Sequence, residues 1–273
     1  MVVTSSDTQS LPVPPPATGR ALEVLWHDLE CGAYRADLAL WRELAESARI
    51  EHGPGPILEV GAGTGRVALA LARAGHQVTA LDLDGGLLLA LGERAADTEL
   101  ETVHGDARTF ALGRRDFALC IAPMQTVQLL GGTRSRIAFL RRARAHLRPG
   151  GVVACAIVTT LESFDSAGGD LAPSAESVRL DGHLYTSRAT RVRVRPRSIR
   201  IERERRILGG ANPVAAGGPA AILASERNIV ELDRVSQAQL EREGIQAGLA
   251  PMPARSVPST DEHVGSVVVM LRA

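Results

Sequence analysis

Residues 57–65 read Ile-Leu-Glu-Val-Gly-Ala-Gly-Thr-Gly, an apolar run that passes directly into a glycine-rich turn. The run predicts a short strand, and residues 66–74 predict a helix that ends at Gly75. Glycines let the backbone adopt positive φ and come close to a ligand, and the amides that open a helix favour an anionic group. The turn therefore predicts a ligand site, although a glycine turn alone does not identify the ligand.

Strands and helices alternate on the carboxyl side of this turn. Further strands are predicted at residues 77–81, 100–103, 116–121 and 152–158, and helices at residues 85–96 and 133–147. Such alternation indicates right-handed strand–helix–strand units around a parallel sheet. The last of these strands is apolar throughout, as expected for a strand buried on both faces.

The pattern changes after residue 160. Residues 162–182 are rich in Ser, Gly and Asp and predict a loop. Antiparallel strands are predicted at residues 183–195, 199–208 and 222–232, followed by a helix at 236–247 and a strand at 264–271. We therefore expect an antiparallel β insert at residues 160–232.

The amino-terminal region divides into two parts. Residues 1–19 include Leu11-Pro-Val-Pro-Pro-Pro16 and predict a disordered, proline-rich tail. Residues 20–50 carry apolar residues at helical spacing, with a break at residues 31–33. We expect residues 20–273 to form a single domain.

Composition narrows the classes of function. The 31 basic residues, all Arg, balance 31 acidic ones, so no net charge draws the chain to nucleic acid or to an anionic membrane. Without Lys, a Schiff-base mechanism is excluded. The 3 Cys lack the spacing of a zinc site or a disulfide framework. No apolar run is long enough to span a bilayer, and the amino terminus does not resemble a signal peptide. We expect a cytoplasmic protein without metal.

Two aspartates follow the strands next to the glycine turn. Asp82 closes the strand at 77–81, where a carboxylate can accept hydrogen bonds from both hydroxyls of a ribose. Asp106 follows the next strand and can accept from an adenine amino group. Dinucleotide enzymes also use an acid at the first position, but they require G-x-G-x-x-G, whereas here Gly65 comes one position early and Arg66 replaces the last glycine.

Taken together, these segments resemble the class I S-adenosylmethionine-dependent methyltransferases. The resemblance rests on residues 57–65, 79–82, 104–107, 116–122 and 147–158, including His146-Leu-Arg-Pro-Gly-Gly151, and covers residues 20–160 and 235–273. It implies an α/β, Rossmann-like sheet of seven mostly parallel strands with an antiparallel last strand and helices on both faces. The sixth strand would lie near Met252–Val257 and the seventh near Ser266–Leu271. Residues 20–52 would form a helical lid.

The resemblance also implies S-adenosyl-L-methionine as cofactor. Glu59 would fix the glycine turn and the methionine end, Asp82 would hold the ribose, and Asp106 the adenine. Tyr34 would contact the methionine moiety, with a packing role as its alternative. The remaining implied cofactor positions are Gly61, Ala62, Gly63, Gly65, Leu83, Ala107 and Ala122.

The acceptor side is less defined. Ile121-Ala-Pro-Met-Gln125 lacks the Asn/Asp-Pro-Pro-aromatic sequence of enzymes that methylate base amines. Methyl transfer is an in-line attack on a sulfonium, so alignment alone can suffice, and we assign no catalytic residue. The candidates for acceptor contact are Gln125, Gln128, His183 and Tyr185, and further candidate bases are His27, His104 and His263.

An inserted antiparallel sheet resembles the acceptor cover or oligomer contact of small-molecule methyltransferases. We therefore favour methyl transfer to a metabolite or natural product, with a possible homo-oligomer formed through the insert. Nine arginines in residues 188–206 leave an RNA or protein methyltransferase as an alternative, although they alternate with apolar residues and the chain holds only 3% aromatics. A non-catalytic protein that binds the cofactor is the other alternative.

Overall fold

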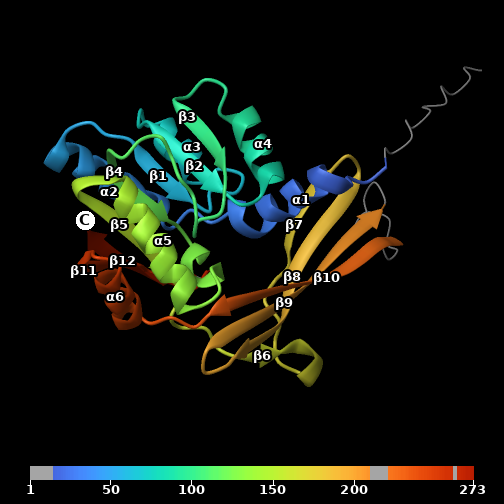
Figure 1. The fold of residues 1–273 in the computed structure, drawn as a ribbon. Helices are drawn as coiled ribbons and strands as arrows, with labels where there is room; N and C mark the ends of the chain where they lie inside the picture. The colour runs from blue at the N-terminus through green and yellow to red at the C-terminus, as the bar shows by residue number, and fades with distance from the viewer. Residues whose placement is uncertain (1–14, 210–220, 261–262) are drawn as a thin grey trace, which may run out of the picture.

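The computed structural model describes residues 15–209, 221–260 and 263–273. Within these ranges a seven-stranded sheet has the order β11-β12-β5-β4-β1-β2-β3 (Figure 1). Its strands are β1 (Ile57–Val60), β2 (Val78–Asp82), β3 (Leu100–His104), β4 (Phe117–Ala122), β5 (Leu147–Ile157), β11 (Ala250–Val257) and β12 (Ser266–Arg272). The strands from β1 to β5 pair in parallel, and β12 runs antiparallel to β5. The predicted sheet, including its sixth and seventh strands, is confirmed.

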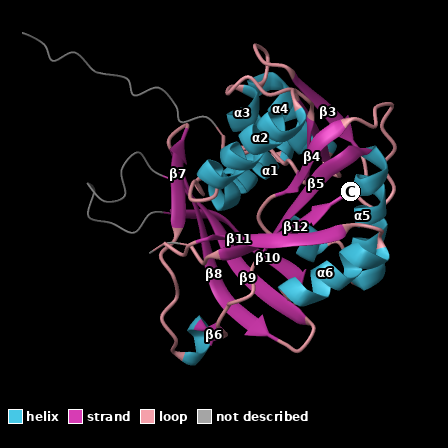
Figure 2. Cartoon of the chain, turned by 90° about the vertical axis from the view of Figure 1, so that its left-hand side faces the viewer, coloured by secondary structure: helices cyan, strands magenta, loops and turns pink. Residues whose placement is uncertain are grey.

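Helices cover both faces of this sheet. Figure 2 shows α2 (Leu38–His52), α3 (Ala68–Ala72) and α4 (Gly85–Arg94) grouped on one side, and α5 (Thr133–His146) and α6 (Gln237–Gln246) on the other. Each side has its own apolar core, centred on Trp41 on the first side and on Phe139 on the second, and both residues are fully buried. Burial of a central strand on both faces explains why β4 carries no polar alternation.

The predicted break in the amino-terminal helix is a wide, π-type turn. α1 (Gly19–His27) continues into η1 (Asp28–Gly32), and α2 begins six residues later. The predicted helix at residues 66–74 is regular only in α3, with single turns on either side. The proline-rich residues 1–14 lie outside the described residues, so the predicted tail is not tested.

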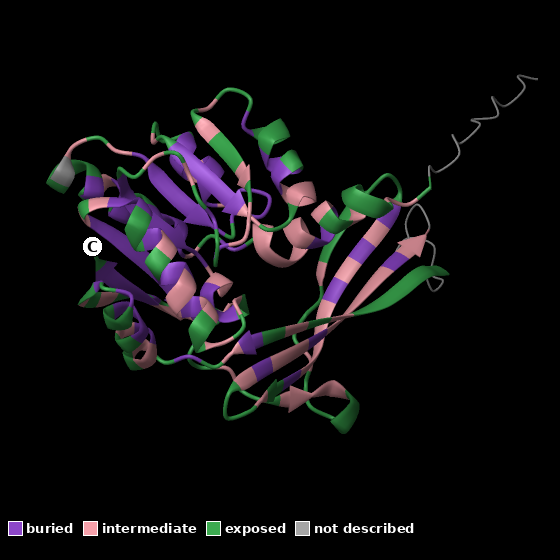
Figure 3. Ribbon diagram, in the orientation of Figure 1, coloured by how far each residue is buried: buried purple, intermediate pink, exposed green. Residues whose placement is uncertain are grey.

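A second sheet follows β5. Its strands are β6 (Phe164–Asp165), β7 (Glu176–Leu180), β8 (His183–Val194), β9 (Ser198–Gly209) and β10 (Ala221–Asp233), with a short helical turn η3 (Ser166–Gly168). Figure 3 shows the difference in burial: β1 and β2 are buried almost throughout, whereas β8 and β9 alternate and β10 is largely exposed. The three long strands agree with the predicted insert. The segment 162–182 is not all loop, because β7 pairs with the edge of β8.

The insert is fastened to the central domain at two places. At the end of the insert that lies beside α1, Tyr185 on β8 packs edge-on against Trp26 of α1, with ring centroids 5.8 Å apart. At its root, Asp233 accepts a hydrogen bond from Arg136 at 2.5 Å, and Arg136 also donates to both oxygens of Glu243 at 2.7 and 2.8 Å. The Arg136 side chain is 2% exposed, so this is a buried, fully paired network that joins α5, α6 and β10.

Replacement of Arg136 tests this root. Arg136→Met leaves the Glu243 carboxylate buried without a cation, which costs about 3–5 kcal/mol of the free energy of unfolding. Urea denaturation at neutral pH measures the loss, with Arg134→Met as the control because Arg134 lies on the same helix and is exposed. An equal effect of both substitutions would contradict the assignment of the network.

Candidate functional site

A cavity of about 420 Å³ opens at the carboxyl ends of β1, β2, β3 and β4. In open α/β sheets this edge is where ligands bind, because the loops that follow the strands converge there. The lining comes from those loops and from the amino-terminal segment. It includes Glu59, Gly61, Ala62, Asp82, Leu83, Asp106, Ala107 and Gln125, all of which the sequence had suggested.

The glycine turn forms the floor of the cavity. Gly61, Gly63 and Gly65 have φ of 74°, 54° and 92°, a region that L side chains rarely adopt. A Cβ on Gly61 would lie 2.5 Å from the Thr126 side chain, and one on Gly63 would lie 2.4 Å from the His27 ring. Of the three glycines, Gly61 lines the cavity, whereas Gly63 and Gly65 do not, and a Cβ on Gly65 would strike Leu91 of α4 at 2.1 Å. Gly65 therefore serves helix packing.

Asp82 joins the glycine turn to the next loop. Its carboxylate accepts from the amide of Gly63 at 2.6 Å and from that of Asp84 at 2.9 Å. Asp84 in turn caps α4 by accepting from the amides of Gly86 and Leu87. The carboxylate of Asp82 is thus held at the cavity wall by two backbone amides.

Asp106 is held by an arginine two residues later. Arg108 donates to both of its carboxylate oxygens, at 2.9 Å from Nε and 2.5 Å from Nη2. This ion pair, with the amide of Arg108, lowers the pKa of Asp106, so the group is a carboxylate at neutral pH. Arg108 also lines the cavity, which the sequence did not indicate because an i, i+2 ion pair has no characteristic pattern.

Glu59 is the most buried acid of the site. It is 2% exposed, and its Oε2 lacks a hydrogen-bond partner among the described residues. Burial raises its pKa to about 8, although Arg66 nearby opposes the shift. A buried carboxyl with a vacant acceptor at a cavity wall matches a ligand that brings its own donor.

The amino-terminal segment closes one side of the cavity. Thr64 of the glycine turn donates to Asp28 at 2.7 Å and lies 3.1 Å from Nδ1 of His27. Burial opposes ionisation of Asp28, but hydrogen bonds from Arg94 and Thr64 outweigh it and lower its pKa. Since Thr64 gives its proton to this carboxylate, His27 donates from Nδ1. Burial lowers the pKa of His27, so Nε2 is unprotonated at neutral pH.

The opposite wall is residues 123–130. Met124 has φ of 54°, unusual for a bulky side chain, and Thr126 donates to the Pro123 carbonyl at 2.9 Å. The side chains of Leu83 and Leu129 line the cavity although they are 66% and 56% exposed. Exposed leucines and a strained backbone at a cavity wall indicate a surface that a ligand covers.

Several suggested residues lie elsewhere. Tyr34 is 8% exposed and packs in the first core, with its ring edge-on to His263 at 4.9 Å and Arg66 5.1 Å above it. Ala122 is fully buried directly before Pro123. His104 donates from Nε2 to the Leu83 carbonyl at 2.9 Å and so supports the loop after β2.

Three candidates for acceptor contact are used in packing. The amide of Gln128 is buried, donating to the carbonyls of Val158 and Asp233 at 3.2 and 2.9 Å and accepting from the Val158 amide at 2.8 Å. Tyr185 accepts from the Ala17 amide at 2.8 Å, and His183 is 4% exposed beside it. Gln128 is bonded to the backbone beside the insert, and Tyr185 contacts Ala17 and Trp26. The structure therefore does not support the prediction that these side chains face an acceptor.

The sequence missed other cavity residues, and each has a physical reason. Leu87 and Leu130 read as ordinary core positions, and Cys31 reads as a small buried residue. Burial raises the pKa of the Cys31 thiol to about 11, so it lines the cavity as an apolar group. In the described part of the chain, no three His, Cys, Asp or Glu side chains gather as metal ligands, and no helix is long and apolar enough to cross a membrane.

Residues 57–151 match the family model of a methyltransferase domain. A cypemycin N-terminal methyltransferase of Streptomyces sp is 35% identical over 114 residues, which are 42% of this chain and 46%, about half, of that relative.

Solved structures match over most of the chain. DesVI of Streptomyces venezuelae has a TM-score of 0.66 at 23% identity, covering 90% of this chain and 94% of that one. CalS10, an amino pentose methyltransferase of Micromonospora echinaspora, has a TM-score of 0.67 at 19% identity, covering 95% and 100%. The sugar N-methyltransferase KedS8 of Streptoalloteichus sp has a TM-score of 0.67 at 17% identity, covering 97% and 99%.

The matched residues 57–151 contain the glycine turn, Asp82 and Asp106, and the fold agrees over nearly the whole described chain. Residues 57–151 therefore match a methyltransferase domain, and the chain has the fold of the solved S-adenosylmethionine-dependent methyltransferases.

Proposed function

We propose that the protein transfers the methyl group of S-adenosylmethionine to an amine nitrogen of a small metabolite or natural product. The observation that carries the cofactor part is the alignment of Glu59, Asp82 and Asp106 around one cavity. They stand at or after the ends of three neighbouring strands, β1, β2 and β3.

The residues that line the cavity suit S-adenosylmethionine as the methyl donor. The free Oε2 of Glu59 would accept from the methionyl ammonium, and the glycine turn leaves room for the backbone of the ligand because no Cβ stands there. Asp82 would accept from the ribose hydroxyls, Asp106 would accept from the adenine amino group, and Ala107 would line the adenine pocket. Leu83, exposed at the cavity wall, would lie against the adenine ring.

The bound donor supplies an electrophilic methyl carbon. The chain's own contribution is alignment and exclusion of water, which converts a bimolecular attack into an intramolecular one. Residues 123–130 are proposed to hold the acceptor, with Gln125 as their polar contact and Leu129 as their apolar one. Gly61 and Thr126 meet where this wall joins the glycine turn, so donor and acceptor walls are positioned together.

An amine acceptor is proposed for two reasons. The cypemycin N-terminal methyltransferase, whose identity to this chain is higher than that of the solved structures described above, is named for methylation of an N-terminus. An amine also needs no strong base once it is neutral. Apart from the acids proposed to bind the cofactor, the described cavity residues offer the neutral imidazole of His27 and no thiolate. We further propose that residues 20–52 act as a lid, since His27 and Cys31 already close one side of the cavity. The insert, residues 160–232, is proposed as an acceptor cover and contact between copies.

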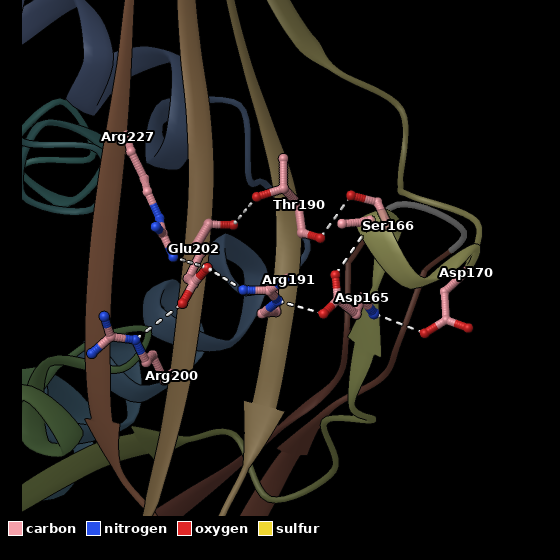
Figure 4. A network of polar contacts seen from close by, with 9 residues as sticks. Asp165, Ser166, Asp170, Thr190, Arg191, Arg200, Glu202 and Arg227 are labelled. Atoms are coloured by element: carbon pink, nitrogen blue, oxygen red, sulfur yellow. Dashed lines mark hydrogen bonds and ion pairs between the residues drawn. The ribbon is translucent and has the colours of Figure 1, made fainter.

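The arginines of the insert do not favour RNA. Figure 4 shows Glu202 accepting from Arg191, Arg200 and Arg227, and Arg191 also donating to Asp165 at 2.6 Å. Arg203 and Arg205 pair with Glu176 and Glu30 in the same way. Because carboxylates of the insert and of η1 pair with most of the arginines in residues 188–206, the insert is a poor match for the free basic stripe that RNA binding requires.

Transfer of labelled methyl groups tests this function. Acceptors are presented in matched pairs, each amine beside the same molecule with a hydroxyl in place of the amine, and label is expected only in the amine. Gly61→Ala should abolish transfer, because its Cβ would strike Thr126, whereas Gly75→Ala should not, because it has similar φ but open space. Label in the hydroxyl compounds, or none despite bound cofactor, would contradict an amine acceptor.

Glu59 gives a prediction for stability against pH. Its pKa in the folded protein is about 8, above the ordinary value of 4.5. At a pH between these two values, Glu59 is protonated in the folded state and ionised in the unfolded state. The free energy of unfolding of the ligand-free protein therefore falls as pH rises from 5 to 8.

Glu59→Gln should remove this dependence. Relative to Glu59→Gln, the wild type should lose at least about 1.4 kcal/mol over that range, the equivalent of one pKa unit. Urea denaturation at the two pH values measures it, with the exposed Glu93→Gln as the control. Identical pH profiles for wild type and Glu59→Gln would refute the buried, protonated carboxyl.

A further inference from the structure

A second cleft, of about 600 Å³, lies behind the glycine turn. It is bounded by α2 and the residues before it on one side and by α3 and the end of α4 on the other. Thr64, Gly65 and Arg66 form the partition between this cleft and the turn. Arg66 lines both spaces, but the remaining walls differ.

Charge in this cleft is strongly unbalanced. Five arginines line it, whereas Asp28 is its only acidic residue. Asp28 is occupied by Arg94, which donates to both carboxylate oxygens at 3.0 and 2.6 Å. Arg66 is likewise committed, to Asp37 at 2.5 and 2.8 Å.

Three guanidinium groups are left over. Arg35, Arg42 and Arg73 are exposed, and within the described ranges none of them has an acidic partner or a hydrogen-bond acceptor. Elsewhere, most arginines of the insert are paired with carboxylates. Arginines without an acidic partner among the described residues also occur at exposed positions such as Arg134 and Arg141, but in this cleft three of them line one concave site.

The floor of the cleft is apolar. Leu38, Leu69 and Ala70 lie between the arginines and give a ligand a surface without hydrogen-bond groups. The volume is within the range of sites for small organic ligands, which is about 300–1,000 Å³. Arginine binds phosphate oxygens in a bidentate manner, and about three negative charges, as on a diphosphate, would balance the three guanidinium groups.

We propose that this cleft is a binding site for an organic diphosphate, with the phosphates on Arg35, Arg42 and Arg73 and the organic part on the leucine floor. The site is separate from the methyl-transfer cavity, and it does not depend on the proposed function. A ligand here would join α2 to α3 and so hold the amino-terminal segment, with His27 and Cys31, against the cofactor cavity.

Calorimetric titration with pyrophosphate and with ADP tests the site. Saturating S-adenosylhomocysteine is present throughout, so that the nucleoside of ADP does not report on the cofactor cavity. Both ligands should bind, orthophosphate should bind at least tenfold more weakly, and binding should weaken as salt is raised.

The variants distinguish this cleft from general charge. Arg42→Ala with Arg73→Ala should weaken pyrophosphate at least tenfold and leave the affinity for S-adenosylhomocysteine unchanged, which also shows that the protein is folded. Arg134→Ala with Arg141→Ala removes the same charge from exposed, unpaired positions on α5 and should have no effect. No binding of pyrophosphate at about 1 mM, equal losses in both double variants, or binding of RNA alone would overturn the proposal.

Discussion

The glycine turn is held against the end of the neighbouring strand by a short set of hydrogen bonds. The amides of Gly61 and Ala62 donate to the carbonyl of Leu81 at 2.8 and 3.2 Å, and the amide of Gly63 donates to Asp82 at 2.6 Å. These bonds require positive φ at the glycines, so the turn cannot form with other residues there. Asp82 therefore has two tasks, because the carboxylate proposed to hold the ribose also fixes the turn that would hold the methionyl group.

The other walls of the cavity are built onto this turn. His27 lies over Gly63, Thr126 over Gly61, and Thr64 joins the turn to Asp28 of the π-type turn. The insert is attached to this part of the structure indirectly, through Gln128. Gln128 belongs to the wall segment at residues 123–130, and its side chain binds the backbone both where the chain leaves β5 for the insert and where β10 returns from it. The side chain of Gln128 thus joins the insert to the proposed acceptor wall.

Local sequence was enough to predict the central sheet and several of the residues that line one cavity. The periodicity of strands and helices, the glycine spacing and the aspartates at strand ends are local signals, and Glu59, Gly61, Asp82 and Asp106 all reach one cavity. The predicted site residues that the structure places outside the cavity make contacts with distant partners. Gln128 is buried by residues 30 and 105 positions away, and Gly65 is required by Leu91 of another helix. No local pattern encodes such contacts, and the short β7 was missed because its exposed residues depend on β8 for pairing.

Titration with S-adenosylhomocysteine, in wild type, Asp82→Ala and Asp84→Ala, tests the central claim most directly. Asp84 lies two residues away and caps α4, so it controls for loss of a carboxylate in the same loop. We predict micromolar binding by the wild type, about −8 kcal/mol, with similar binding by Asp84→Ala and none by Asp82→Ala. Absence of binding by the folded wild type, or full binding by a folded Asp82→Ala, would contradict the assignment of the cavity as the cofactor site.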